Sequence, residues 1–168
     1  MSQRATGSFD VKVTPQKPDT QIARAANLSR LTIDKRFHGD LEGISKGEML
    51  ALQTDTKGSA GYVALERVTG KLKGRSGSFV LQHSGTLERG EEHTQVSVVP
   101  DSASGELRGL TGTMNIRVAE DGAHSYAFDF KIDPSTTLPF GVREPARGNR
   151  YLSGKVILER APGAVENA

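Results

Sequence analysis

The sequence predicts an all-β protein built as an eight-stranded antiparallel barrel. Apolar and polar residues alternate with a period of two along most of the chain, and no window shows a helical stripe. Nineteen glycines against seven prolines indicate many tight turns. Short strands at even spacing are typical of a barrel or a sandwich, and we favour the barrel because closure removes exposed strand edges.

The alternation places all eight strands before residue 133. They are expected at residues 5–14, 28–38, 44–54, 59–69, 75–85, 91–99, 113–119 and 123–132. Pro15 should end the first strand, since proline cannot donate a hydrogen bond to a ladder. Short helical turns are expected at 21–26 and at 106–110, the second capped by Ser102 or Ser104 and plugging one end of the barrel.

The strand at 44–54 departs from simple alternation. Leu50 and Leu52 fall on one face, whereas Met49 and Ala51 fall on the other. A strand that is apolar on both faces is usually buried on both. We therefore expect the barrel core to cover one face and a neighbouring subunit to cover the other.

The character of the chain changes after Asp133. Three prolines, Pro134, Pro139 and Pro145, interrupt an irregular segment, and a further strand is expected at 151–159. The sequence thus divides into a barrel domain at 1–132 and a C-terminal extension at 133–168. The extension would either close over the barrel mouth or reach a partner subunit.

Composition narrows the classes of function. The 22 Lys and Arg nearly balance the 20 Asp and Glu, and no basic run is interleaved with aromatic residues, so nucleic-acid binding has little support. The absence of cysteine excludes disulfides and thiol chemistry. No apolar run reaches the length of a membrane helix or a signal peptide. We expect a cytoplasmic protein with no membrane partner.

Glu66 is the first candidate catalytic residue. It shares a strand face with Tyr62, which predicts an inward carboxylate in an apolar barrel. Burial without a partner would raise its pKa and make it a usable acid or base. The structural alternative is that Glu66 pairs with an arginine such as Arg75.

His83 is the second candidate, because it shares a face with Phe79 and titrates near neutrality. Strand parity puts Arg67 and Gln82 on the faces opposite to Glu66 and His83. No histidines stand at metal-ligand spacing, so neither a metal nor another cofactor is expected.

Apolar side chains would form the walls of a cavity around these groups. The candidate ligand-contacting residues are Phe79, Met114, Tyr126, Phe128 and Arg75. The aromatic ones among them are also the ordinary filling of a small barrel. The sequence leaves open whether the barrel is hollow or filled.

Four segments carry a resemblance to a known family. They are FHGDLEG at 37–43, YVALERVTGKLKGRSGSFVLQHSG at 62–85, VVPDSASGELRGLTG at 98–112 and HSYAFDF at 124–130. In these segments the chain resembles the bacterial domain of unknown function family 3224. The resemblance implies an eight-stranded barrel similar to that of allene oxide cyclase, within the calycin-like group, and it implies homo-oligomers. The extension after residue 132 departs from the family.

Two functions from different classes are predicted. The first is a cofactor-independent isomerase or cyclase acting on a small apolar substrate of polyene or polyketide type. Glu66 would serve as base or electrostatic stabiliser, with Tyr62 and His83 as hydrogen-bonding partners, and the barrel would hold a reactive conformer. The second is a non-catalytic carrier or sensor for a small hydrophobic ligand. The fold alone does not choose between them.

Overall fold

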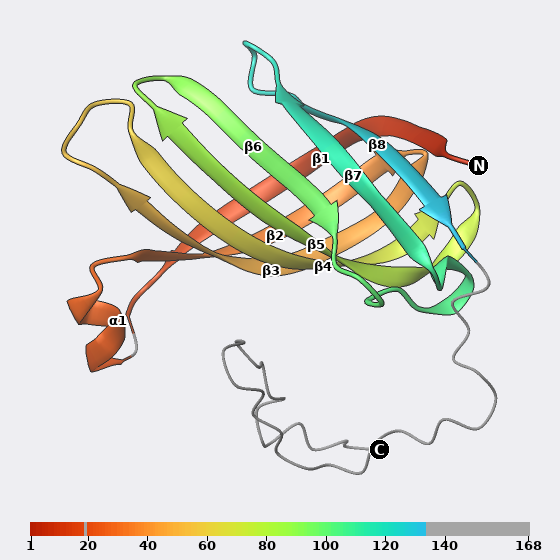
Figure 1. Ribbon diagram of the computed structural model, residues 1–168, viewed down its shortest axis with the longest axis horizontal. Coiled ribbons are helices and arrows are strands. Elements are labelled where there is room, and N and C mark those ends of the chain that lie inside the picture. The colour runs from red at the N-terminus through yellow and green to blue at the C-terminus, as the bar shows by residue number, and fades with distance from the viewer. Residues whose placement is uncertain (19, 134–168) are drawn as a thin grey trace. The chain divides into compact units, whose positions relative to one another are not determined.

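The chain folds as a closed antiparallel barrel in which each strand pairs with its neighbour in sequence and β8 closes on β1 (Figure 1). The computed structural model describes residues 1–18 and 20–133. The predicted extension at 133–168, with its strand at 151–159, lies outside the described residues except for Asp133. The strands are β1 Gln3–Gln16, β2 Ser29–Gly39, β3 Leu41–Gln53, β4 Ala60–Leu72, β5 Arg75–Glu88, β6 Glu91–Val98, β7 Leu110–Val118 and β8 His124–Ile132. The predicted all-β fold is confirmed.

Two hairpins, β4–β5 and β5–β6, are tighter than the sequence predicts, and the strands β4 and β5 that they join are longer. The β4–β5 connection is reduced to Lys73 and Gly74, with φ angles of 46° and 82°, and Arg89 and Gly90 join β5 to β6 with φ angles of 50° and 98°. Two successive residues of positive φ form the turn whose twist matches a β-hairpin, and glycine adopts that conformation without strain.

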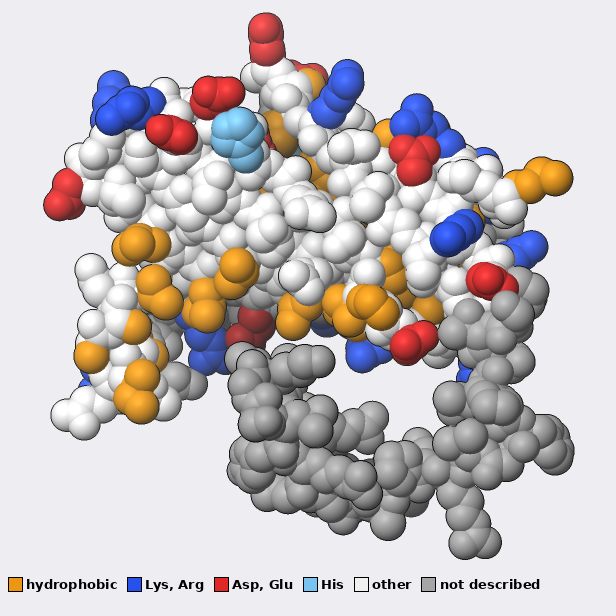
Figure 2. Space-filling model, in the orientation of Figure 1, with side chains coloured by type: hydrophobic (Ala, Val, Ile, Leu, Met, Phe, Trp, Pro, Cys, Tyr) orange, Lys and Arg blue, Asp and Glu red, His pale blue; other side chains and the backbone are white. Residues whose placement is uncertain are grey.

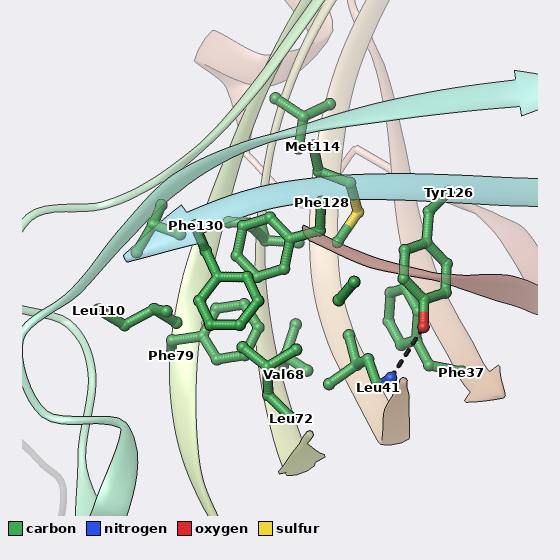
Figure 3. Packing of buried hydrophobic residues seen from close by; sticks show 14 of the residues in the cluster. Phe37, Leu41, Val68, Leu72, Phe79, Leu110, Met114, Tyr126, Phe128 and Phe130 are labelled. Atoms are coloured by element: carbon green, nitrogen blue, oxygen red, sulfur yellow. Dashed lines mark hydrogen bonds between the residues drawn. The ribbon is translucent and has the colours of Figure 1, made fainter. Parts of the chain in front are cut away.

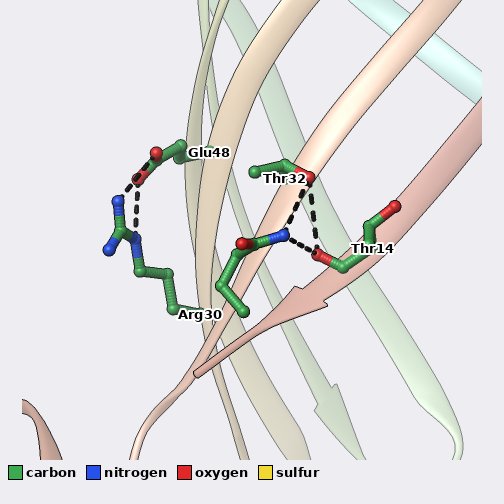
Figure 4. A network of polar contacts seen from close by, with 5 residues as sticks. Thr14, Arg30, Thr32 and Glu48 are labelled. Atoms are coloured by element: carbon green, nitrogen blue, oxygen red, sulfur yellow. Dashed lines mark hydrogen bonds and ion pairs between the residues drawn. The ribbon is translucent and has the colours of Figure 1, made fainter. Parts of the chain in front are cut away.

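Pro15 does not end β1, which continues to Gln16. Residues 3–9 of β1 pair with β8, but residues 10–16 pair with β2 alone. Pro15 therefore lies on a stretch of β1 with one free edge, where the missing N–H breaks no ladder. On the same stretch of β1, the Thr14 carbonyl (Figure 4) accepts a hydrogen bond from Gln16 Nε2 at 3.1 Å.

The first predicted helical turn is present, and the second is present only in part. α1 spans Gln21–Ala25, and its cap is the Thr20 hydroxyl, which accepts a hydrogen bond from the Ala23 N–H at 3.0 Å. The second is the shorter 3₁₀ helix Gly105–Leu107, whose Ser104 occupies the cap position without a side-chain cap bond. Leu107 is fully buried in the core, as a plug at one end of the barrel requires.

Aromatic and aliphatic side chains fill the end of the barrel beside this plug (Figure 3). The Phe79 and Phe128 rings stack with centroids 5.9 Å apart, and Phe130 stacks on Phe128 at 5.3 Å. Leu41, Leu72 and Leu110 pack beside them. We call this part of the barrel the closed half.

The opposite end, which we call the open half, is not filled in this way. Its inward-facing side chains are half-buried or exposed: Val11, Leu31, Met49, Ala51, Tyr62, Leu87 and Ile116 are half-buried, and Val13, Thr94 and Val118 are exposed. The barrel wall is also less completely paired between β6 and β7, because among the described residues Ser97 and Thr113 form the single register pair of these two strands. The two halves of one barrel thus differ in packing.

Gly47 should be among the positions least tolerant of a side chain. A Cβ atom there would lie 2.6 Å from Glu66 Cα and closer still to the Leu65 carbonyl. We expect Gly47→Ala to lower the free energy of unfolding by about 2 kcal/mol, because backbone must shift to admit it. Urea unfolding measures this loss.

Gly61→Ala is the matched control for that experiment, since its Cβ would meet nothing nearer than 3.9 Å. We expect its stability to equal or slightly exceed that of the wild type, because alanine reduces the entropy of the unfolded chain. Equal stability of the two variants would contradict the close approach of β3 and β4 at Gly47.

Candidate functional site

Four polar side chains are buried where the closed half meets the open half. They are Lys35, Ser45, Glu66 and His83, and between 0% and 6% of each residue is exposed. They come from four adjacent strands, β2, β3, β4 and β5, and each occupies an inward position in the alternation of its strand. We call these residues the ionic cluster.

The Glu66 carboxylate is the centre of the cluster. Its Oε1 atom lies 2.8 Å from Lys35 Nζ and 2.8 Å from His83 Nε2. Its Oε2 atom accepts a hydrogen bond from Ser45 Oγ at 2.7 Å. Both oxygens are thus engaged, which a buried carboxylate requires.

The electrostatics of the cluster keep Glu66 ionised. Burial by itself would raise the pKa of Glu66, but the hydrogen bond from His83 and the charge of Lys35 outweigh it, and the pKa falls to about 2. The Lys35 ammonium is further stabilised by the Phe9 ring, whose centroid lies 4.9 Å away. Glu66 is therefore a permanent anion at neutral pH.

The alternation of β4 and β5 is confirmed. Glu66 and His83 are buried, whereas Arg67 and Gln82 are exposed. The expected pairing of Glu66 with an arginine such as Arg75 is wrong in its partner, because the ion pair is made with Lys35. Arg75 begins β5 opposite Leu72 and is exposed, nine residues from Glu66 along the hairpin.

The candidate wall residues lie in the closed half. Phe79, Met114, Tyr126 and Phe128 are between 0% and 3% exposed and belong to the main apolar cluster. The Tyr126 hydroxyl accepts a hydrogen bond from the Leu41 N–H at 2.8 Å (Figure 3) and donates one to the His38 carbonyl at 3.2 Å. These side chains are therefore part of the packed apolar core of the closed half.

Tyr62 lies apart from the cluster, toward the open half. It stands four residues from Glu66 along β4, which corresponds to roughly 13 Å. Its ring occupies the space beside Gly85 on β5, where a Cβ atom would collide with it. The structure brings Glu66 and His83 together but places Tyr62 apart from them, on the inner wall of the open half.

Lys35 and Ser45 are the members of the cluster that the sequence prediction missed. Lys35 lies between Ile33 and Phe37 on the inward face of β2, so parity alone marks it as an inward lysine. Ser45 sits between Gly43 and Gly47, on a face with little side-chain volume. The available signal was a charged residue inside an apolar row.

Two kinds of site are absent from the part of the chain that the structure describes. No three His, Asp or Glu side chains converge there as they would around a metal ion. No described helix is both long and apolar enough to cross a membrane.

The closed eight-stranded barrel and its internal ionic cluster define a small antiparallel barrel protein with one ionic cluster in an apolar interior. The chain belongs to the family described as protein of unknown function (DUF3224), whose model matches residues 5–130. A crystal structure of a DUF3224 protein from Shewanella oneidensis MR-1 is similar, with a TM-score of 0.73 and 48% identity over 80% of this chain and 99% of the other. No curated protein matches the chain significantly.

The ionic cluster predicts a specific dependence of stability on pH. The pKa of Glu66 is about 2 in the folded protein against an ordinary value of 4.5. A carboxyl group with a lowered folded-state pKa stabilises the fold above its unfolded pKa, and this contribution is lost as the pH falls through the folded value. Between about pH 5 and pH 2 we expect the wild type to lose about 3 kcal/mol more stability than Glu66→Gln.

Urea unfolding of both proteins at several pH values measures that difference. We expect Glu66→Gln to be less stable than the wild type near neutrality. The comparison therefore concerns how steeply the free energy of unfolding falls with pH in the acid range, and not its value at neutral pH. If the free energy of unfolding fell equally steeply with pH in both proteins below pH 5, the result would contradict the ion pair between Lys35 and Glu66.

Proposed function

We propose that the protein is a non-catalytic binding protein, a carrier or a sensor, for a small apolar molecule held in the open half of the barrel. One observation carries the proposal: the closed half is packed, the open half has half-buried apolar walls, and the ionic cluster lies between them. Ligand sites are typically apolar with a few fixed polar groups.

The cluster also indicates the chemistry of the ligand. An ammonium group has three N–H donors, and the bond from Lys35 to Glu66 uses one of them. His83 directs Nε2 at Glu66, which leaves Nδ1 as its second polar atom. A ligand with an apolar body and one terminal oxygen, such as a ketone or a hydroxyl, would therefore fit this end of the barrel.

The properties of Glu66 favour binding over catalysis. A carboxylate whose pKa is about 2 is a poor acceptor for a substrate proton. Glu66 instead anchors Lys35, Ser45 and His83 in fixed positions. Preorganised polar groups of this kind reduce the entropy that a ligand loses on binding.

An isomerase or cyclase is the second candidate, and the hydrogen bond between His83 and Glu66 favours it. A carboxylate that accepts from one ring nitrogen fixes the tautomer of the imidazole and leaves the other nitrogen as a proton acceptor. In this version His83 would be the base and Glu66 its positioning residue. Tyr62 on the wall would orient a polyene or polyketide-like substrate.

Binding is tested with prodan, an apolar naphthalene fluorophore that carries one ketone oxygen. We expect saturable binding with a blue shift in its emission. Lys35→Met should weaken the affinity about tenfold, as loss of one good hydrogen bond implies. Lys46→Met is the matched control, since Lys46 is an exposed lysine on the outside of β3.

Thermal unfolding of both variants should first establish that each is folded at the assay temperature. Equal affinities of Lys35→Met and Lys46→Met, or the absence of saturable binding, would contradict the proposed site. Conversion of candidate polyenes, followed by mass spectrometry, separates the two functions. Turnover that His83→Gln abolishes would favour the isomerase.

A further inference from the structure

The outside of β3 and β4 carries an apolar stripe. Its members point outward yet are large and hydrophobic, with exposures of 44% for Leu50, 42% for Leu52, 55% for Val63 and 52% for Leu65. Leu50 lies opposite Val63 in the register of the two strands, so the stripe is continuous. Hydrophobic side chains gather along the lower side of the barrel, over β3 and β4, in Figure 2.

The apolar stripe also borders two hollows. These hollows, of about 870 and 1020 Å³, adjoin along β3 and β4, and the outward-facing Leu50 and Val63 line both of them. Residues of the inner face of the same strands, such as Tyr62 and Glu66, border them as well. One continues over β5 and β6 to His93 and Gln95, and the other over β2 and β5 to Arg30 and Gln82. Contiguous exposed apolar surface of this kind is typical of a protein interface.

Charges of opposite sign flank the stripe. At one end Lys46 lies opposite Arg67 in the register. Lys46 contacts Asp34 at 3.2 Å, but Arg67 has no carboxylate within ion-pair distance among the described residues. Toward the other end, beyond Ser84, the outward positions of the β5–β6 hairpin include Glu88 and Glu91, both exposed.

The spacing of these charges is symmetrical about the centre of the stripe. Val63 lies opposite Ser84 in the register of β4 and β5. Arg67 is four residues from Val63 in one direction, and Glu88 is four residues from Ser84 in the other, so each lies roughly 13 Å from the centre. A two-fold axis through this centre would bring Arg67 of one chain near Glu88 of another.

We propose that a second copy of this chain packs on this face, related by a two-fold axis near Leu50 and Val63. The apolar stripe would form the buried centre of the interface. The charged ends would form its polar rim, beside the exposed Arg30–Glu48 ion pair (Figure 4). The inference concerns the outer wall and is independent of the proposed ligand site inside the barrel.

Analytical ultracentrifugation of the full chain tests the proposal. We expect the wild type to sediment as a dimer of the 18.0 kDa chain. Val63→Glu should weaken the dimer at least a hundredfold, because it places a carboxylate at the centre of the interface. Val118→Glu is the control for the added charge, since Val118 is 62% exposed, belongs to the inward-facing row of β7 and lies outside both hollows. It should remain dimeric.

The charged rim is tested with a second pair of variants. Arg67→Glu should weaken the dimer about tenfold, and adding Glu88→Arg in the same chain should restore it. Circular dichroism melts establish that each variant is folded. A monomeric wild type at about 100 μM, or a Val63→Glu variant that dimerises like the wild type, would overturn the proposal. Failure of the double variant to recover would overturn the two-fold arrangement.

Discussion

The buried carboxylate of Glu66 is the constraint on which the rest of the barrel depends. An ionised carboxyl group inside a protein is tolerated when donors surround it, and the three donors here come from β2, β3 and β5. A one-residue slip of any of these strands would turn its donor outward. The ionic cluster therefore fixes the register of four adjacent strands, and Gly47 supplies the space that this register requires.

Much of this arrangement could be predicted from the alternation of the sequence. Parity separates Glu66 from Arg67 and His83 from Gln82, because successive side chains of a strand point to opposite faces. The same rule explains why Leu50 and Leu52 stand outside the barrel and Met49 and Ala51 inside. Glycines mark the hairpins because the turns demand positive φ angles.

What parity cannot supply is position along the barrel axis. Phe79 and Tyr62 both point inward, yet one lies in the packed half and the other on the open wall. That difference depends on where the 3₁₀ helix inserts Leu107 and on how far β8 extends along β1. The partner of Glu66 was missed for a related reason: Lys35 looks like an interruption of an apolar row until four strands are in register.

β4 links the interior of the barrel to its outer wall. Glu66 points inward between Leu65 and Arg67, which point outward, so one short backbone segment contributes both to the ionic cluster and to the apolar stripe. If both proposals hold, β4 offers a path by which a ligand that shifts Glu66 would also shift the surface on which a second copy packs. Linkage then requires reciprocity: by whatever factor the ligand changes the dimer affinity, dimerisation changes the ligand affinity by the same factor. Even a zero coupling would be informative, because it would mean that β4 behaves as a rigid wall between two independent surfaces.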